Sequence, residues 1–179
     1  TVSTDGSNIF INSPIINTIP YSGKTILNTY LSGNPQISDF IGFGNNALVN
    51  LNDAFPADIT TLPDAFIGWV VQYSGQITRV DNLIKFSIPT TVTEQVDIYC
   101  GIFRCEENDI GMNLIWFDLV FSTTSNISVG DYVQRSFAPN TDVEAGWTLY
   151  LVFFAHRPSA SGSVDPIEFY TSTGLTLRG

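Results

Sequence analysis

The segment Trp147-Thr-Leu-Tyr-Leu-Val-Phe-Phe-Ala155 is the strongest β-strand signal in this chain of 179 residues. Gly146 precedes it, and the residues that fill it are mainly the β-branched and aromatic types that favour strands. One face of the expected strand carries Trp147, Leu149, Leu151 and Phe153, and the other carries Thr148, Tyr150, Val152 and Phe154. A sheet with one face in water alternates apolar and polar residues. A strand that is apolar on both faces therefore meets something other than water on its second face.

A second strand of this kind is expected at Met112-Asn-Leu-Ile-Trp-Phe-Asp-Leu-Val-Phe121. Another copy of the chain would cover the extra apolar face, because identical subunits assemble through surfaces that close into rings. The candidate interface of the resulting homotrimer consists of Phe117, Leu119, Phe121, Tyr150, Val152 and Phe154. The alternative is that residues 45–64 of the same chain cover this face.

Strand signals continue outward from these two segments, whereas no window shows the apolar repeat and caps of a helix. Further strands are expected at residues 8–11, 14–16, 25–27, 40–43, 65–73, 76–80, 83–88, 94–104, 131–137, 167–170 and 174–177. Residues 45–64 are expected to form a loop, because Pro56 and Pro63 interrupt them. Eight to ten antiparallel strands with turns at short intervals predict an all-β fold, a jelly-roll β-sandwich.

The charge content excludes several classes of partner. Charged residues make up 13% of the chain, with 17 acidic and 7 basic residues and a formal net charge of −10. Nucleic acids and anionic membrane surfaces both select clustered Lys and Arg, so neither is an expected partner. No apolar run approaches the roughly 18 residues of a membrane helix. Residues 1–6 lack the basic start and apolar core of a secretory signal, so a targeting segment is expected outside this sequence.

The two cysteines, Cys100 and Cys105, are five positions apart. In a continuous strand this odd spacing places them on opposite faces and roughly 16 Å apart. A disulfide requires Cα atoms within about 7 Å. Two free thiols are therefore expected, unless the strand turns at Gly101, and the spacing matches no zinc-binding pattern.

No catalytic constellation emerges from the sequence. The single histidine, His156, follows the strongest strand, and the sequence identifies no nucleophile for it. A catalytic triad would need that histidine, and the Gly-x-Ser-x-Gly turn of hydrolases is absent. The domain is therefore expected not to be an enzyme.

Carboxylates are concentrated in two places. Glu106, Glu107 and Asp109 lie in an expected hairpin loop, and Asp53, Asp58 and Asp64 form a second group. A solvated turn is the simplest interpretation of the first group. A calcium site is the alternative interpretation, because Ca²⁺ takes carboxylate and carbonyl oxygens from loops. No other cofactor is expected.

Carbohydrate binding is the main alternative to an assembly role. It requires exposed aromatic platforms beside polar side chains. Trp69, Trp116 and Trp147 all fall inside expected strands, which favours core positions for them. A carbohydrate-binding adhesin or a phage fibre tip remains the rival interpretation.

Five stretches of the chain resemble successive landmarks of one protein family, in the same order and at similar spacing. They are Pro20-Tyr-Ser-Gly23, Ile41-Gly-Phe-Gly-Asn45, Ser74-Gly-Gln-Ile-Thr78, Trp147-Thr-Leu-Tyr-Leu-Val-Phe153 and Tyr170-Thr-Ser-Thr-Gly-Leu-Thr-Leu177. The family is the C-terminal domain of collagen-like exosporium glycoproteins, the BclB-type proteins of spore-forming Firmicutes. The likeness spans residues 19–179, whereas residues 1–18 match nothing in the family.

The resemblance implies a trimeric jelly-roll head similar to those of C1q and tumour necrosis factor. Residues 19–179 would form the head, and residues 1–18 an extension or stalk junction. The head would trimerise a collagen-like stalk on the spore surface and present an external surface to other spore-coat proteins or glycans. The stalk itself is absent from this sequence, which has no Gly-X-Y period. The family supplies no catalytic residues to transfer.

Overall fold

The computed structural model describes residues 2–4, 9–11, 16–30, 32–42, 46–50, 68–159 and 165–179. The described residues form strands, turns and bends, and none of them forms a helix that could cross a membrane. The strands are β1 (Val2–Thr4), β2 (Ile9–Ile11), β3 (Ile16–Thr29), β4 (Pro35–Ile41), β5 (Asn46–Asn50), β6 (Trp69–Val70), β7 (Gly75–Phe86), β8 (Val96–Cys105), β9 (Met112–Thr123), β10 (Tyr132–Phe137), β11 (Thr141–Val143), β12 (Thr148–His156) and β13 (Ile167–Arg178).

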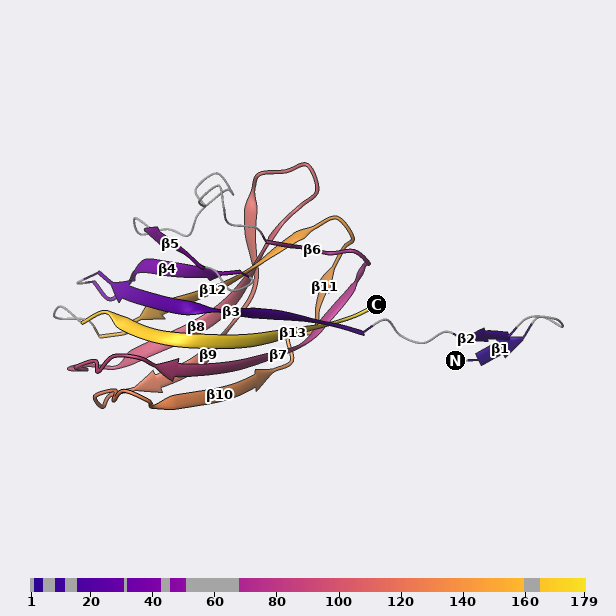
Figure 1. The fold of residues 1–179 in the computed structure, drawn as a ribbon. Coiled ribbons are helices and arrows are strands. Elements are labelled where there is room, and N and C mark those ends of the chain that lie inside the picture. The colour runs from indigo at the N-terminus through magenta and orange to yellow at the C-terminus, as the bar shows by residue number, and fades with distance from the viewer. Residues whose placement is uncertain are drawn as a thin grey trace.

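Eight of these strands form two layers (Figure 1). One layer has the order β10-β7-β13-β3, and the other has the order β4-β12-β8-β9. Every pairing is antiparallel. When the eight strands are numbered along the chain, the layers read 6-3-8-1 and 2-7-4-5, which is the strand order of a jelly roll. The predicted all-β jelly-roll sandwich is confirmed.

The main hydrophobic core lies between the two layers. It contains Leu149, Leu151 and Phe153 from β12, each at most 1% exposed, which is the face expected to point inward. They meet Val80, Ile84 and Phe86 of β7 and Phe169, Leu175 and Leu177 of β13. Every second residue is buried along β13 and from Val80 to Phe86 of β7, as the two-residue period of a strand requires, and a register shift at Thr78 separates Ile77 from this alternation.

Four expectations about individual strands differ from the structure. The segment expected as a loop contains β5, which pairs with β4. Residues 76–80 and 83–88, expected as two strands, form one strand, and so do residues 167–170 and 174–177. Of the strand expected at residues 65–73, the described part holds only Trp69–Val70. Asp53, Asp58 and Asp64 lie outside the described residues.

Strands β3 and β13 pair along their full common length, from Ile16 opposite Arg178 to Leu27 opposite Ile167. Figure 1 shows them side by side, with the C-terminus at the end where β3 begins. Pro20 lies inside β3, where it faces Gly174 of β13. Proline is tolerated there because β3 is the edge of its layer and joins β4 only near Asn28 and Thr29.

The two layers are joined on one side and open on the other. The joint is the short pairing of β3 with β4. On the opposite side the path ends at β9 in one layer and at β10 in the other, and no ladder joins these two strands in the described part of the chain. The sandwich is therefore an almost closed sheet with one open seam between β9 and β10.

Candidate functional site

Two β-bulges in β9 decide which of its side chains face the solvent. Ile98 and Tyr99 of β8 pair with Phe121 and Leu119, so Val120 is an extra residue in β9. A second shift makes Ile115 an extra residue in the same way. A bulge reverses the alternation of faces beyond it. Phe117 and Leu119, which lie between the bulges, therefore face outward, whereas Phe121 turns into the sandwich.

The outward face of β8, β9 and β12 carries a group of aromatic and aliphatic side chains, which we call the outer patch. It consists of Tyr99, Phe117, Leu119 and Phe154. The rings of Tyr99 and Phe154 are stacked, with centroids 5.2 Å apart. Phe117 lies 6.0 Å from Tyr99 and 6.3 Å from Phe154. Phe117 is 54% exposed and Leu119 is 39% exposed, so the patch offers water an apolar surface.

The six residues of the candidate interface are in three different environments. Phe117 and Leu119 are exposed on the outer patch. Tyr150, Val152 and Phe154 are already buried within one chain, in a second cluster with Phe40 and Phe103. Val49 of β5 belongs to the same cluster, so the chain itself covers part of this face. This agrees with the alternative that residues 45–64 provide cover.

The structure corrects the placement of Phe121 in the candidate interface. Its ring packs against the main core and lies 5.2 Å from the ring of Phe86. The assignment of Phe121 to one face with Phe117 and Leu119 assumed an unbroken strand. The bulge at Val120 breaks that period.

The two cysteines are free and buried. Cys100 lies in the main core and Cys105 in the second cluster, so they occupy opposite faces of β8 as predicted. Burial raises the pKa of both thiols, and the nearby carboxylates Asp109 and Glu106 raise that of Cys105 further. Because the thiolate is the reactive form of cysteine, neither side chain is suited to nucleophilic catalysis.

A polar row borders the outer patch. Asp97 of β8 lies opposite Ser122 of β9 and His156 of β12. The Asp97 carboxylate is 5% exposed and accepts hydrogen bonds from Ser122 Oγ (2.6 Å) and Gln95 Nε2 (3.0 Å). The hydroxyl of Ser122 therefore donates to a carboxylate, whereas a triad nucleophile donates to histidine. The row does not have the geometry of a catalytic triad.

Each carboxylate of the β8–β9 hairpin interacts with a different neighbour. Glu106 forms an ion pair with Arg104 (2.8 Å), whose guanidinium lies 4.1 Å from the centroid of the Trp147 ring. Asp109 Oδ1 accepts the amides of Ile110 and Gly111. Glu107 lies beside Gly146. In the described ranges, no group of three or more His, Cys, Asp or Glu residues could hold a metal ion.

The outward face of the β10-β7-β13-β3 layer, which we call the open face, carries most of the positive charge. Strand register places Lys24, Arg79, Lys85 and Arg178 on it, which are four of the seven basic residues of the chain. Asp81, Asp142 and Glu168 share this face. Small residues such as Ser22, Ser172 and Gly174 keep its centre flat, and Leu83 and Tyr170 are exposed on it.

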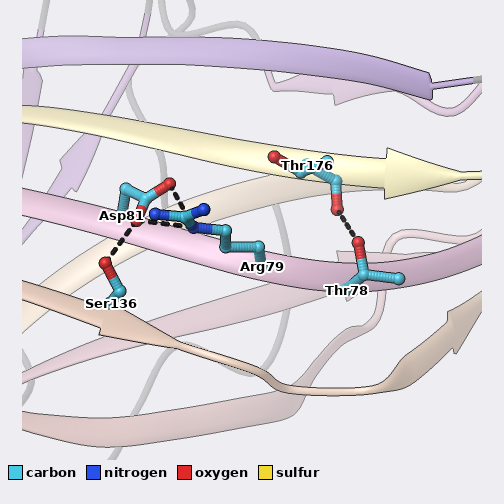
Figure 2. Close-up of polar contacts among 5 residues, drawn as sticks. All are labelled: Thr78, Arg79, Asp81, Ser136 and Thr176. Atoms are coloured by element: carbon cyan, nitrogen blue, oxygen red, sulfur yellow. Dashed lines mark hydrogen bonds and ion pairs between the residues drawn. The ribbon is translucent and has the colours of Figure 1, made fainter.

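Hydrogen bonds fix the polar side chains of the open face. Figure 2 shows Asp81 between Arg79 and Ser136, and it accepts a hydrogen bond from each. Thr78 donates to the carbonyl oxygen of Thr176, across the β7–β13 pair. Lys24 Nζ lies 2.7 Å from Glu168 Oε1. The lysine and the Ser87 hydroxyl lower the pKa of Glu168, so this carboxylate stays ionised at neutral pH.

Sequence reasoning identified Phe117 and Leu119 but missed Tyr99, the polar row and the open face. The pattern of β8 gave no reason to separate Tyr99 from other strand residues. The open face is assembled from four strands that are distant in the sequence, so its charges are not grouped in the chain. The one available signal was the basic content of residues 79–85 in an otherwise acidic chain.

Comparisons with known proteins give structural similarity only. No family model matches the chain, and no curated protein matches it. A structure of the infectious bursal disease virus Gx strain has 8% identity and a TM-score of 0.47, and a crystal structure of the infectious bursal disease virus VP2 subviral particle has 10% identity and the same TM-score. In both cases the match covers 99% of this chain and 37% of the viral one.

The K1 cleaved adhesin domain of Lys-gingipain from Porphyromonas gingivalis W83 is similar at 16% identity, with a TM-score of 0.29. That match covers 93% of this chain and 92% of the adhesin domain. This chain thus spans about a third of the viral chains and almost all of the adhesin domain. At TM-scores below 0.5, these similarities carry no functional argument.

Proposed function

We propose that this domain is a non-catalytic, homotrimeric head that assembles a surface protein outside the cell. The observation that carries the proposal is the outer patch, where Phe117 and Leu119 are exposed side by side on the last strand of a layer. Exposed apolar groups at the rim of a sandwich favour contact with another protein surface. Burying them against a second copy removes apolar surface from water, which is the main driving force of association.

The second copy would present its open face to the outer patch. That face is flat, carries exposed Leu83 and Tyr170, and holds four basic residues. The outer patch itself is apolar, because the register with Cys100 places the exposed side chain of Asp118 on the opposite face of β9. The two surfaces therefore differ from each other. A contact between different surfaces is heterologous, and three such contacts close a ring.

The location and the stalk rest on the family resemblance. It implies the exosporium of a spore as the site and a collagen-like stalk as the covalent partner. The common end of β3 and β13 supports this arrangement, because a stalk that precedes β3 would enter the head there. The protonated thiols and the hydrogen bond from Ser122 to Asp97 support a role without catalysis.

Light scattering at micromolar concentration tests the assembly. The expected solution mass is three times the 19.7 kDa of one chain. Phe117→Asp and Leu119→Asp should each give monomers that unfold within a few degrees of the wild-type monomer, because both side chains are exposed in one chain. Leu83→Asp should weaken the same assembly from the other side, because Leu83 is 43% exposed on the open face.

Ile110→Asp is the matched control, because Ile110 is 56% exposed but lies in the β8–β9 hairpin. It should leave the trimer intact. A monomeric wild-type protein at this concentration would rule out the proposed assembly. Loss of the trimer in Ile110→Asp as well would show that a charge at any exposed apolar position dissociates the trimer. The outer patch would then no longer be identified as the interface.

A further inference from the structure

A cavity of about 450 Å³ opens in the seam between the two layers, where β9 ends and β10 begins. It is lined by residues of the ends of β7 and β9, of the β9–β10 connection and of the start of β10. Its volume falls within the roughly 300–1,000 Å³ of small-molecule sites. Neither Phe117 nor Leu119 lines it, so it is separate from the outer patch, and only Tyr132 at its border also lies on the open face, opposite Lys85.

The inner wall of the cavity is apolar and partly aromatic. Phe121 is its partly exposed ring, and the buried Phe86 packs behind it at a centroid distance of 5.2 Å. Ile127 and Val133 extend this wall. The bulge at Val120 is what turns Phe121 toward the cavity. The wall therefore suits the C–H face of a flat ring.

The rest of the lining carries hydrogen-bonding groups and one negative charge. Thr123 supplies a hydroxyl, Asn126 an amide and Asp131 a carboxylate. The described lining residues include no Lys, Arg or His. A carboxylate without a basic neighbour repels anions and accepts hydrogen bonds from hydroxyl groups. The lining thus favours a ligand with several hydroxyl groups and no negative charge.

The loop that carries these groups is held in place from both sides. The amide of Phe86 donates to Asp131 O (2.8 Å), and the amide of Gly130 donates to Phe86 O (2.9 Å). Thr90 and Ile127 exchange two backbone hydrogen bonds, and Asn126 Oδ1 accepts the amide of Val92 (2.9 Å). Asp131 Oδ2 accepts the amide of Ser128. A loop that is ordered before binding loses little conformational entropy when the ligand binds, which favours affinity.

We infer that this cavity binds one ring of a neutral carbohydrate. An aromatic and aliphatic wall beside Thr, Asn and Asp side chains matches a pyranose, which has an apolar C–H face and a rim of hydroxyl groups. Tyr132 is 71% exposed where it borders the cavity, and it can extend the contact to a second ring. The sequence did not reveal the cavity, because only the three tryptophans were considered as aromatic platforms and its lining residues are distant in the chain.

Saturation-transfer NMR on the whole domain tests this inference. The probes are the methyl glycosides of glucose, galactose, mannose and N-acetylglucosamine, together with sialic acid, glucuronic acid and choline. At least one neutral glycoside should bind, and the two acids should not. Asp131→Asn and Tyr132→Ala should each weaken that binding about tenfold, which is the scale of one charged hydrogen bond or one ring contact.

Matched controls separate this site from other aromatic and acidic positions. Tyr170→Ala removes a tyrosine that is 55% exposed on the same layer but does not line the cavity. Asp118→Asn removes an exposed carboxylate of β9 that does not line the cavity. Neither change should affect glycoside binding. Thermal melts of all four variants establish that each one is folded.

Several outcomes would overturn the inference. They are the absence of binding by every neutral glycoside, binding of the acids or of choline alone, and equal weakening by the variants and their controls. Light scattering on the wild-type protein keeps this test apart from the proposed function, because a monomeric wild type that binds a glycoside would uphold the cavity and rule out the assembly.

Discussion

Cys100 and Cys105 show how one strand can place two identical side chains in different surroundings. Cys100 is 0% exposed among core residues of both layers, and Cys105 is 3% exposed in the second cluster. The Cys105 thiol donates a hydrogen bond to Asp109 O (2.9 Å). Both sulfur atoms thus act as small packing groups in this fold.

Both thiols should therefore be unreactive in the native protein. With Ellman's reagent at pH 8, we expect almost no release of thionitrobenzoate until guanidinium unfolds the chain, after which two thiols per chain should react. The physical reason is that burial blocks access and raises both pKa values. The midpoint of thermal unfolding should be equal with and without reductant. Rapid labelling of the native protein would contradict the burial of at least one cysteine.

At the scale of the strand, the bulges of β9 predict opposite results for two phenylalanines that are four positions apart. Phe121→Ala removes a ring from the main core and should lower the free energy of unfolding by about 2 kcal/mol or more. Phe117→Ala removes an exposed ring and should cost less than about 1 kcal/mol in the monomer. Urea unfolding at a concentration where the protein is monomeric measures both. Similar losses from the two changes would mean that β9 lacks the bulge at Val120.

The same strand shows what the sequence could and could not predict. The alternation in Trp147–Ala155 identified Leu149, Leu151 and Phe153 as core, because β12 runs without a bulge and the period of two holds. In β9, the positions of the two register shifts against β8 decide which side chains face the core. The sequence of β9 alone does not reveal those positions. The outer patch was therefore half predicted, through Phe117 and Leu119.

Arg157 illustrates a further limit of sequence reasoning. It follows β12, beyond the strand expected from the sequence, yet its side chain is 1% exposed. Its Nε donates to Thr29 Oγ1 (2.8 Å) and its Nη2 to Tyr30 O (3.1 Å). These acceptors belong to the β3–β4 corner, more than 120 positions away in the chain. Local composition contains no information about such a contact.

For the whole molecule, the charge distribution matters more than any single ion pair. The formal net charge is −10 at neutral pH and the isoelectric point is about 4.1. Like-charge repulsion should keep the protein soluble at pH 7 and should vanish near pH 4, as carboxylates take up protons. We expect turbidity in low salt near pH 4 that clears when the pH returns to 7. Clear solutions throughout this titration would show that solubility comes from the neutral polar surface.

The pairing of β3 with β13 also determines when this domain can fold during its synthesis. Of the sandwich strands, β3 is synthesised first and β13 last. The position between β3 and β7 in their layer is therefore unfilled until residues 167–178 have left the ribosome. Contacts between distant segments form slowly, because the chain must close a large loop before it gains them. The nascent chain should therefore remain protease-sensitive until the last strand emerges, and a ribosome stalled before β13 should hold an unfolded domain.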